Sequence, residues 1–203
     1  MMPDAREFDV VAGKGEAMAR LRPLERRELT AQGREVWDWY VGTRGYELKD
    51  NYRTLLHSPE AAKRFSELGE YLRFRCSVPP RLRQVAILAT ARSVDSHWVW
   101  TLHALLAPND GVSREVIDSL GEGRVPVEGS LEEQTVAEFA FQLLREHRVS
   151  EEVFRRAQGV LGDGGVVDLS LLVGYYASMG LAMAAFEVRP EPEVESTLPA
   201  LGG

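Results

Sequence analysis

The chain has 203 residues, of which 44% are hydrophobic and 27% charged, enough apolar content for one globular domain with a buried core. Its net charge of −7 argues against nucleic acid or an anionic membrane as the main partner, because both require concentrated positive charge. One cysteine, Cys76, excludes an intramolecular disulfide, and no secretory leader or 18-residue apolar run is evident, so we expect a cytoplasmic protein.

The first third of the chain predicts two helices separated by a connection. The first helix is expected over residues 24–41, where apolar residues recur at helical spacing before two glycines. Residues 46–57 are expected to form an irregular connection. Ser58 followed by Pro59 is typical of a helix start, which predicts the second helix from there to about Arg75.

The stretch Pro79–Ser113 predicts a helical hairpin around which the other helices pack. Two prolines at its start suit the first turn of a helix, and residues 82–91 are then apolar on nearly all sides. Such a helix belongs in the middle of a fold. Small polar residues at 93–96 interrupt it, and a second helix is predicted over 97–106.

The rest of the chain predicts four further helices and no strand. Their expected ranges are 114–120, 131–147, a short helix from Ser150 that Gly159 and Gly162 end, and 166–188. The last helix is long and apolar, and packing in the core or at a subunit interface explains it better than a membrane span. We expect one domain over 24–188, between an N-terminal arm (1–23) and a flexible C-terminal tail (189–203).

The second helix of the hairpin contains the best candidate for a functional side chain, His103. Ser96 lies seven positions earlier, so the two residues differ by about 20° around the helix and share a face. His97 lies roughly 120° from His103, so the two imidazoles cannot bind one metal ion as an i, i+4 pair. The four histidines are too scattered in the sequence to predict a metal site, and we expect no cofactor.

The motifs around His103 follow a characteristic order. The string PPRLRQVAILATAR precedes a polar break, Trp100-x-x-His103 and a loop at Gly111-Val112-Ser113, and flanking features occur at Ser58-Pro59 and Tyr175-Tyr176. This order resembles the carboxymuconolactone decarboxylase family, whose relatives include the alkylhydroperoxidase D-like proteins. The resemblance implies an all-α, alkylhydroperoxidase D-like helical bundle around a central hairpin, assembled as a homotrimer or homohexamer.

The activity that the resemblance implies is that of a lyase. Such an enzyme transfers protons on a small carboxylated lactone or a compound derived from an aromatic ring, by decarboxylation or a related isomerisation or elimination. This sequence differs from the family's pattern at two places. Where the peroxidase-like relatives have C-x-x-C-x-x-x-H, this chain has Ser96 and Val99 ahead of His103, and where a glutamate is customary it has Gln84. A thiol peroxidase is therefore disfavoured, and a non-catalytic helical oligomer that binds a ligand or a protein is the alternative.

The candidate site residues follow from the helix face that His103 occupies and from the family resemblance. His103 is the predicted acid or base, because imidazole titrates near neutral pH, and Gln84 is placed with it as the residue at the family's glutamate position. The predicted substrate-binding residues are Ser96, Trp100, Arg92 and Tyr175. Capping, surface exposure and core packing are the structural alternatives for these four residues.

Overall fold

The computed structural model describes residues 19–45, 47–188 and 196–200, and within these ranges the chain is helical and contains no β-strand. The α-helices are α1 (Ala31–Arg44), α2 (Asp50–Leu55), α3 (Pro59–Phe74), α4 (Pro80–Ser93), α5 (His97–Leu106), α6 (Arg114–Gly121), α7 (Leu131–Arg145) and α8 (Glu151–Phe186). Two 3-10 turns are η1 (Arg26–Glu28) and η2 (Ala107–Asp110). The predicted all-α class is confirmed.

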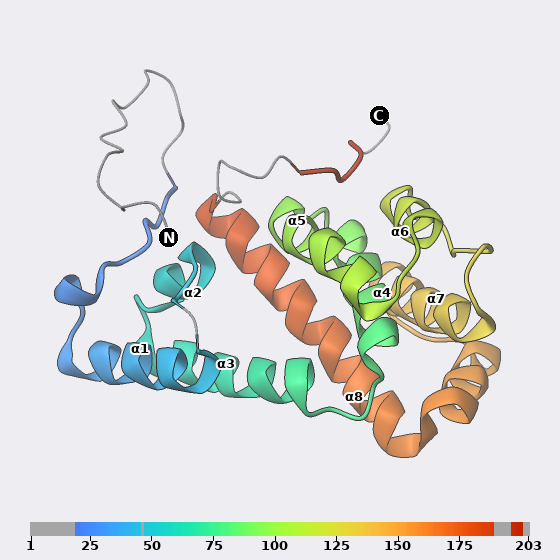
Figure 1. Ribbon diagram of the computed structural model, residues 1–203, viewed down its shortest axis with the longest axis horizontal. Coiled ribbons are helices and arrows are strands. Elements are labelled where there is room, and N and C mark those ends of the chain that lie inside the picture. Colours follow the sequence, from blue (N-terminus) through green and yellow to red (C-terminus); the bar gives the residue numbers. More distant parts are fainter. Residues whose placement is uncertain (1–18, 46, 189–195, 201–203) are drawn as a thin grey trace, which may run out of the picture.

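Helix α4 lies at the centre of the molecule, as its sequence predicted. It packs against α5, α6, α7 and α8, and side chains on all its sides are buried, among them Val85, Leu88 and Ala91. Figure 1 shows α8 running diagonally across the molecule, with α1, α2 and α3 on one side of it and α4 to α7 on the other. The hairpin of α4 and α5 therefore faces the N-terminal helices across α8.

Serine and threonine side chains fix most helix starts. The hydroxyls of Ser96, Ser113 and Ser150 each accept a hydrogen bond from the backbone N–H three residues later, and Ser130 forms a capping box with Glu133. These caps satisfy N–H groups that have no partner within the helix.

Three parts of the helix prediction differ from the structure by more than a few residues. Residues 46–57 are not irregular, because α2 forms there; a six-residue helix has little periodicity of its own, and burial of Tyr52 and Thr54 stabilises it. Helix α1 begins at Ala31 rather than at residue 24, because Thr30 caps it. Helix α8 runs through Gly159 and is interrupted only at Gly162, whose φ of 70° suits glycine.

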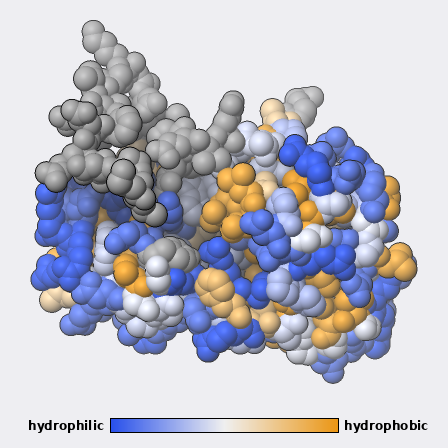
Figure 2. Space-filling model, in the orientation of Figure 1, coloured by the Kyte–Doolittle hydropathy of each residue, from blue (hydrophilic) through white to orange (hydrophobic). Residues whose placement is uncertain are grey.

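Helix α8 is long and apolar enough to cross a membrane by length and composition alone. Half of its most apolar window is buried against the rest of the protein, as in core helices of globular proteins. The face of the molecule in Figure 2 is largely hydrophilic, and its hydrophobic residues form separate patches.

Residues 196–200 lie against the hairpin that contains His103. The indole Nε1–H of Trp100 donates to Thr197 Oγ1 at 3.1 Å, and Arg92 Nη1 donates to the carbonyl of Pro199 at 2.6 Å. Leu198 is only 5% exposed. This part of the predicted flexible tail is thus extended and packed on the domain, whereas 189–195, 201–203 and most of the predicted N-terminal arm (1–18) lie outside the described residues.

Candidate functional site

A cavity of about 160 Å³ lies between α8, the hairpin helix α5 and the N-terminal helices. Its walls combine one imidazole, four tyrosines, three cations and several apolar or amide side chains. They are His103; Tyr40, Tyr52, Tyr175 and Tyr176; Arg44, Lys49 and Arg73; and Asn51, Gly69, Trp98, Leu102, Leu106 and Met179. Among these residues none is acidic and none is a cysteine.

His103 is buried, with 2% of its surface exposed, and one ring nitrogen is hydrogen-bonded to Gln84. Its Nδ1 lies 2.8 Å from Gln84 Oε1, and Gln84 Nε2 donates to Asp110 Oδ2 at 2.7 Å. A carboxylate only accepts hydrogen bonds, so the NH₂ of the amide faces Asp110 and its oxygen faces the imidazole. Nδ1 of His103 therefore carries the proton, and Nε2 carries the lone pair.

The environment of His103 keeps the ring neutral. Burial, and secondly the positive charge of Arg73, lower its pKa from the ordinary value of 6.5 to about 3. At neutral pH the resting ring is consequently a hydrogen-bond acceptor and a base at Nε2, and it has no proton to give from that atom.

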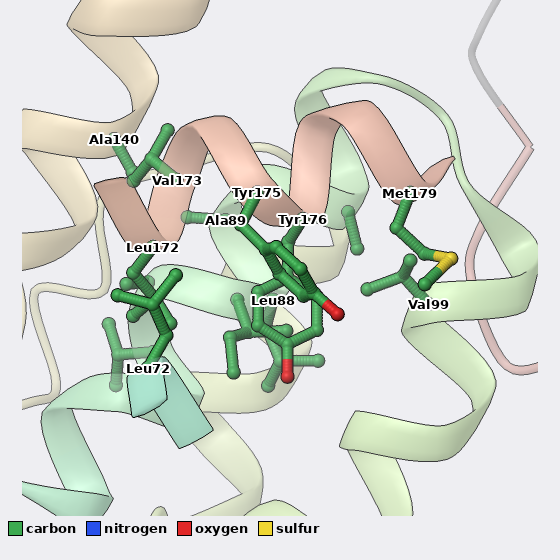
Figure 3. Close-up of a cluster of buried hydrophobic side chains, with 14 of the residues drawn as sticks. Leu72, Leu88, Ala89, Val99, Ala140, Leu172, Val173, Tyr175, Tyr176 and Met179 are labelled. Carbon is green, nitrogen blue, oxygen red and sulfur yellow. The ribbon is translucent and has the colours of Figure 1, made fainter. Parts of the chain in front are cut away.

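One tyrosine packs directly against the imidazole, and a second tyrosine packs against the first. The ring of Tyr176 meets that of His103 edge-on at a centroid distance of 4.9 Å, and Tyr175 meets Tyr176 in the same way at 5.2 Å. Figure 3 shows Tyr175, Tyr176 and Met179 leaving one stretch of α8 among buried side chains. Burial and the neighbouring Tyr52 raise the pKa of Tyr175 well above its usual value, so its hydroxyl stays protonated.

Three cationic side chains reach the cavity from the N-terminal helices. Arg44 of α1 lies over the ring of Tyr40, 5.0 Å from its centroid, Arg73 comes from α3, and Lys49 precedes α2. These basic side chains and the tyrosine rings give the lining of the cavity both cationic and aromatic groups. The cavity suits a small anion that carries an apolar or flat body.

The structure brings together some of the predicted site residues and separates the others. Tyr175 lines the cavity with His103, and Gln84 bonds directly to the imidazole. The Ser96 hydroxyl caps α5, while Trp100 and Arg92 bond to residues 197 and 199 as described above. These three residues are not among those that line the cavity.

The sequence did not indicate the cationic part of the cavity. Arg44, Lys49 and Arg73 are three basic residues among many, and Lys49 and Tyr52 lie in the segment predicted as irregular. Asp110 ends η2, in the loop that follows α5, and no sequence motif distinguishes it. No local pattern marks these residues, because they meet through tertiary packing.

Neither a thiol nor a metal cluster is associated with this site in the described part of the chain. Cys76 follows α3, donates to the Leu72 carbonyl at 3.0 Å and does not line the cavity. Val99, at one of the family's cysteine positions, is fully buried. Within the described ranges, no three histidine, cysteine, aspartate or glutamate side chains converge as metal ligands.

The comparison with protein families covers part of this site. Residues 59–142 match the model of the carboxymuconolactone decarboxylase family. The match includes Gln84, His103 and Asp110, whereas the tyrosines of α8 lie beyond it. No curated protein matches the sequence.

Solved structures share the fold of this chain. One is an uncharacterised peroxidase-related protein from Ralstonia eutropha JMP134, described as an alkylhydroperoxidase AhpD core, with a TM-score of 0.72 and 16% identity over 88% of this chain and 95% of that one. Another is a variant of the debrominase Bmp8 in complex with 2,3,4-tribromopyrrole, with a TM-score of 0.66 and 16% identity over 85% and 91% of the two chains. The predicted alkylhydroperoxidase D-like fold is thereby confirmed.

Proposed function

We propose that the protein is a lyase or isomerase without a redox thiol, acting by proton transfer on a small carboxylated ring compound such as an unsaturated lactone. The observation that carries the proposal is the neutral imidazole of His103 in a cavity that aromatic and basic side chains line. The cations would hold the carboxylate, and the tyrosine rings would contact the flat body of the substrate. A relative of the same fold, the debrominase, binds a flat brominated pyrrole.

The protonation state of His103 favours a base as the first step. Nε2 would take a proton from a carbon next to the ring carbonyl, and the electron pair of the broken C–H bond would move onto the carbonyl oxygen. That negative charge is stabilised by the cations and by the hydroxyl of a protonated tyrosine. The imidazolium then returns the proton to another ring carbon, which completes an isomerisation.

Decarboxylation would use the same groups in a different order. The C–C bond to the carboxylate breaks, CO₂ leaves, and the electron pair is delocalised into the unsaturated lactone. A proton must then be added at carbon, and His103 would relay it from solvent, because Nε2 carries none in the resting state.

A panel of unsaturated lactone carboxylates and ring carboxylates, followed by NMR for product formation, tests the proposal. We expect turnover of at least one member, and a drop in rate of about 10²-fold or more in His103→Gln, with unchanged helix content by circular dichroism. Full activity in His103→Gln would remove His103 from the mechanism. The same activity in Cys76→Ser would exclude a thiol mechanism, the third candidate function.

The second candidate is a non-catalytic binding protein. The pKa of about 3 favours it, since it makes the resting imidazole a weak base. A binding protein would be stabilised thermally by panel members without forming any product. Such stabilisation across the panel, with no conversion of any member, would replace the enzymatic proposal by this one.

We also propose that the protein is a homo-oligomer, as the family resemblance implies. The outward face of α8 supports this proposal, because Val167, Leu171 and Leu181 are 58%, 46% and 58% exposed. Gly174 and Ser178 lie on the same face and would let an identical helix approach closely. Light scattering at several concentrations tests it, and a monomer at all of them would contradict it.

A further inference from the structure

We propose that Asp110 is a positioning residue, which acts through the amide of Gln84 to set the tautomer of His103. This inference rests on the proposed function insofar as the tautomer decides which ring nitrogen is the base. Asp110 lies at the end of η2, outside the cavity, and the Gln84 side chain stands between it and the imidazole.

Asp110, Gln84 and His103 form a hydrogen-bonded chain in which donors and acceptors can be assigned in only one way. The carboxylate of Asp110 accepts at one end, and the imidazole can donate or accept at the other. An amide has a donor on one side and an acceptor on the other. Because Asp110 accepts from the NH₂ group of Gln84, the amide oxygen must face the ring, and Nδ1 must carry the proton. The distances of 2.7 and 2.8 Å show that both bonds are formed.

The turn after α5 brings Asp110 back towards α4. Gly111 ends η2 with a φ of 88°, and the N–H of Val112 donates to the Ala107 carbonyl. This geometry directs the Asp110 carboxylate to Gln84, 26 residues earlier in the chain. The loop between α5 and α6 thus contributes a residue to the site without lining the cavity.

Gln84 and Asp110 are chemically matched. A glutamate at position 84 would place two carboxylates at hydrogen-bond distance, where they repel each other or share a proton. An asparagine at position 110 would leave the Gln84 amide free to take either orientation, because both partners then donate and accept. Changing both residues restores a single direction, since the new amide at position 110 would donate to the new carboxylate at position 84, which would also accept from Nδ1–H of His103.

Nitrogen NMR of the ¹⁵N-labelled imidazole of His103 at neutral pH tests this proposal in the ligand-free protein. We expect a protonated Nδ1 and an unprotonated Nε2 in the wild type, and a mixture of both tautomers in Asp110→Asn. In the double variant Gln84→Glu with Asp110→Asn, we expect the wild-type tautomer to return. Asp118→Asn is the matched control, because Asp118 is exposed on α6 and pairs with Arg114.

Two results would overturn the proposal: a wild-type ring protonated at Nε2, or a pure Nδ1–H tautomer in Asp110→Asn. If Asp110→Asn does not fold, the double variant decides, because it must show the Nδ1–H tautomer. Where a substrate is found, Asp110→Asn should lower kcat about tenfold with KM within a factor of two, since the side chain does not line the cavity. The NMR result is independent of turnover, so the proposed function can fail while this inference stands.

Discussion

The hydroxyls of Tyr52 and Tyr175 lie 2.6 Å apart, which joins α2 to α8 at the wall of the cavity. This contact depends on a residue that has no side chain. A Cβ at Gly69 of α3 would lie 2.1 Å from the Tyr175 hydroxyl oxygen, far inside van der Waals contact. Gly69 is therefore required for the position of Tyr175 rather than for a turn.

Gly69→Ala should destabilise the protein. We expect a loss of about 1–3 kcal/mol in the free energy of unfolding, because the buried Tyr175 ring must move and lose its bond to Tyr52. Gly42→Ala is the control, since a Cβ there meets nothing within 4 Å, and it should stabilise α1 by about 0.5–1 kcal/mol. Urea unfolding of both variants measures the difference, and equal stability of the two would contradict the packing described here.

The depressed pKa of His103 predicts a loss of stability in acid. The folded protein keeps the ring neutral down to about pH 3, whereas the unfolded chain binds a proton near the ordinary value of 6.5. The unfolded state thus binds more protons between these values, so stability falls as pH falls through this window. At pH 5 the effect of this one group is about 2 kcal/mol.

His103→Gln isolates this effect, because glutamine does not titrate. The stability advantage of the wild type over the variant should shrink from pH 7 to pH 5 and remain constant from pH 7 to pH 8. A difference that does not change over the whole range would show that the ring is accessible enough to be protonated in the folded state.

Arg73→Gln should affect the site in two ways. Removing its positive charge raises the pKa of His103, since Arg73 is the second cause of the depression. Binding of a probe anion such as benzoate should weaken about tenfold or more by calorimetry, because a charge-assisted contact is lost. Arg64→Gln on the exposed side of α3 is the control and should leave both quantities unchanged.

The docked residues 196–200 should stabilise the hairpin. Leu198→Ala is expected to cost about 2–3 kcal/mol, because the leucine is almost fully buried. The near-ultraviolet dichroism of Trp100 should weaken as well, because its indole bonds to the adjacent Thr197. Leu131→Ala serves as control, since that side chain is 78% exposed. If Leu198→Ala and Leu131→Ala are equally stable, Leu198 contributes nothing to the free energy of unfolding in solution.

The parts of the fold that local sequence encodes could be predicted. The uniform apolarity of α4 placed it in the core, and the helix starts predicted at residues 114 and 131 and at Ser150 agree with the structure. The family resemblance singled out His103 and Gln84, which bond to each other. Helix α2 was not predicted, because its stability comes from buried contacts rather than from a periodic pattern of apolar residues.

The remainder of the site depends on distances that sequence spacing does not encode. Arg73 and Lys49 are 30 and 54 positions from His103, and Asp110 reaches Gln84 only through the turn at Gly111. Trp100 shares its helix with His103, yet it turns towards the C-terminal segment. A tryptophan three residues before a histidine does not by itself indicate which side of the helix holds the cavity.

The three cations of the cavity belong to a molecule whose net charge is −7. An anion that approaches from solution is repelled by the net negative charge of the molecule as a whole. In physiological salt the Debye length is roughly 8 Å, so mobile ions screen the distant repulsion far more than the contacts inside. The encounter rate with an anionic ligand should therefore rise with ionic strength, the opposite of the behaviour of a protein that steers its ligand from afar.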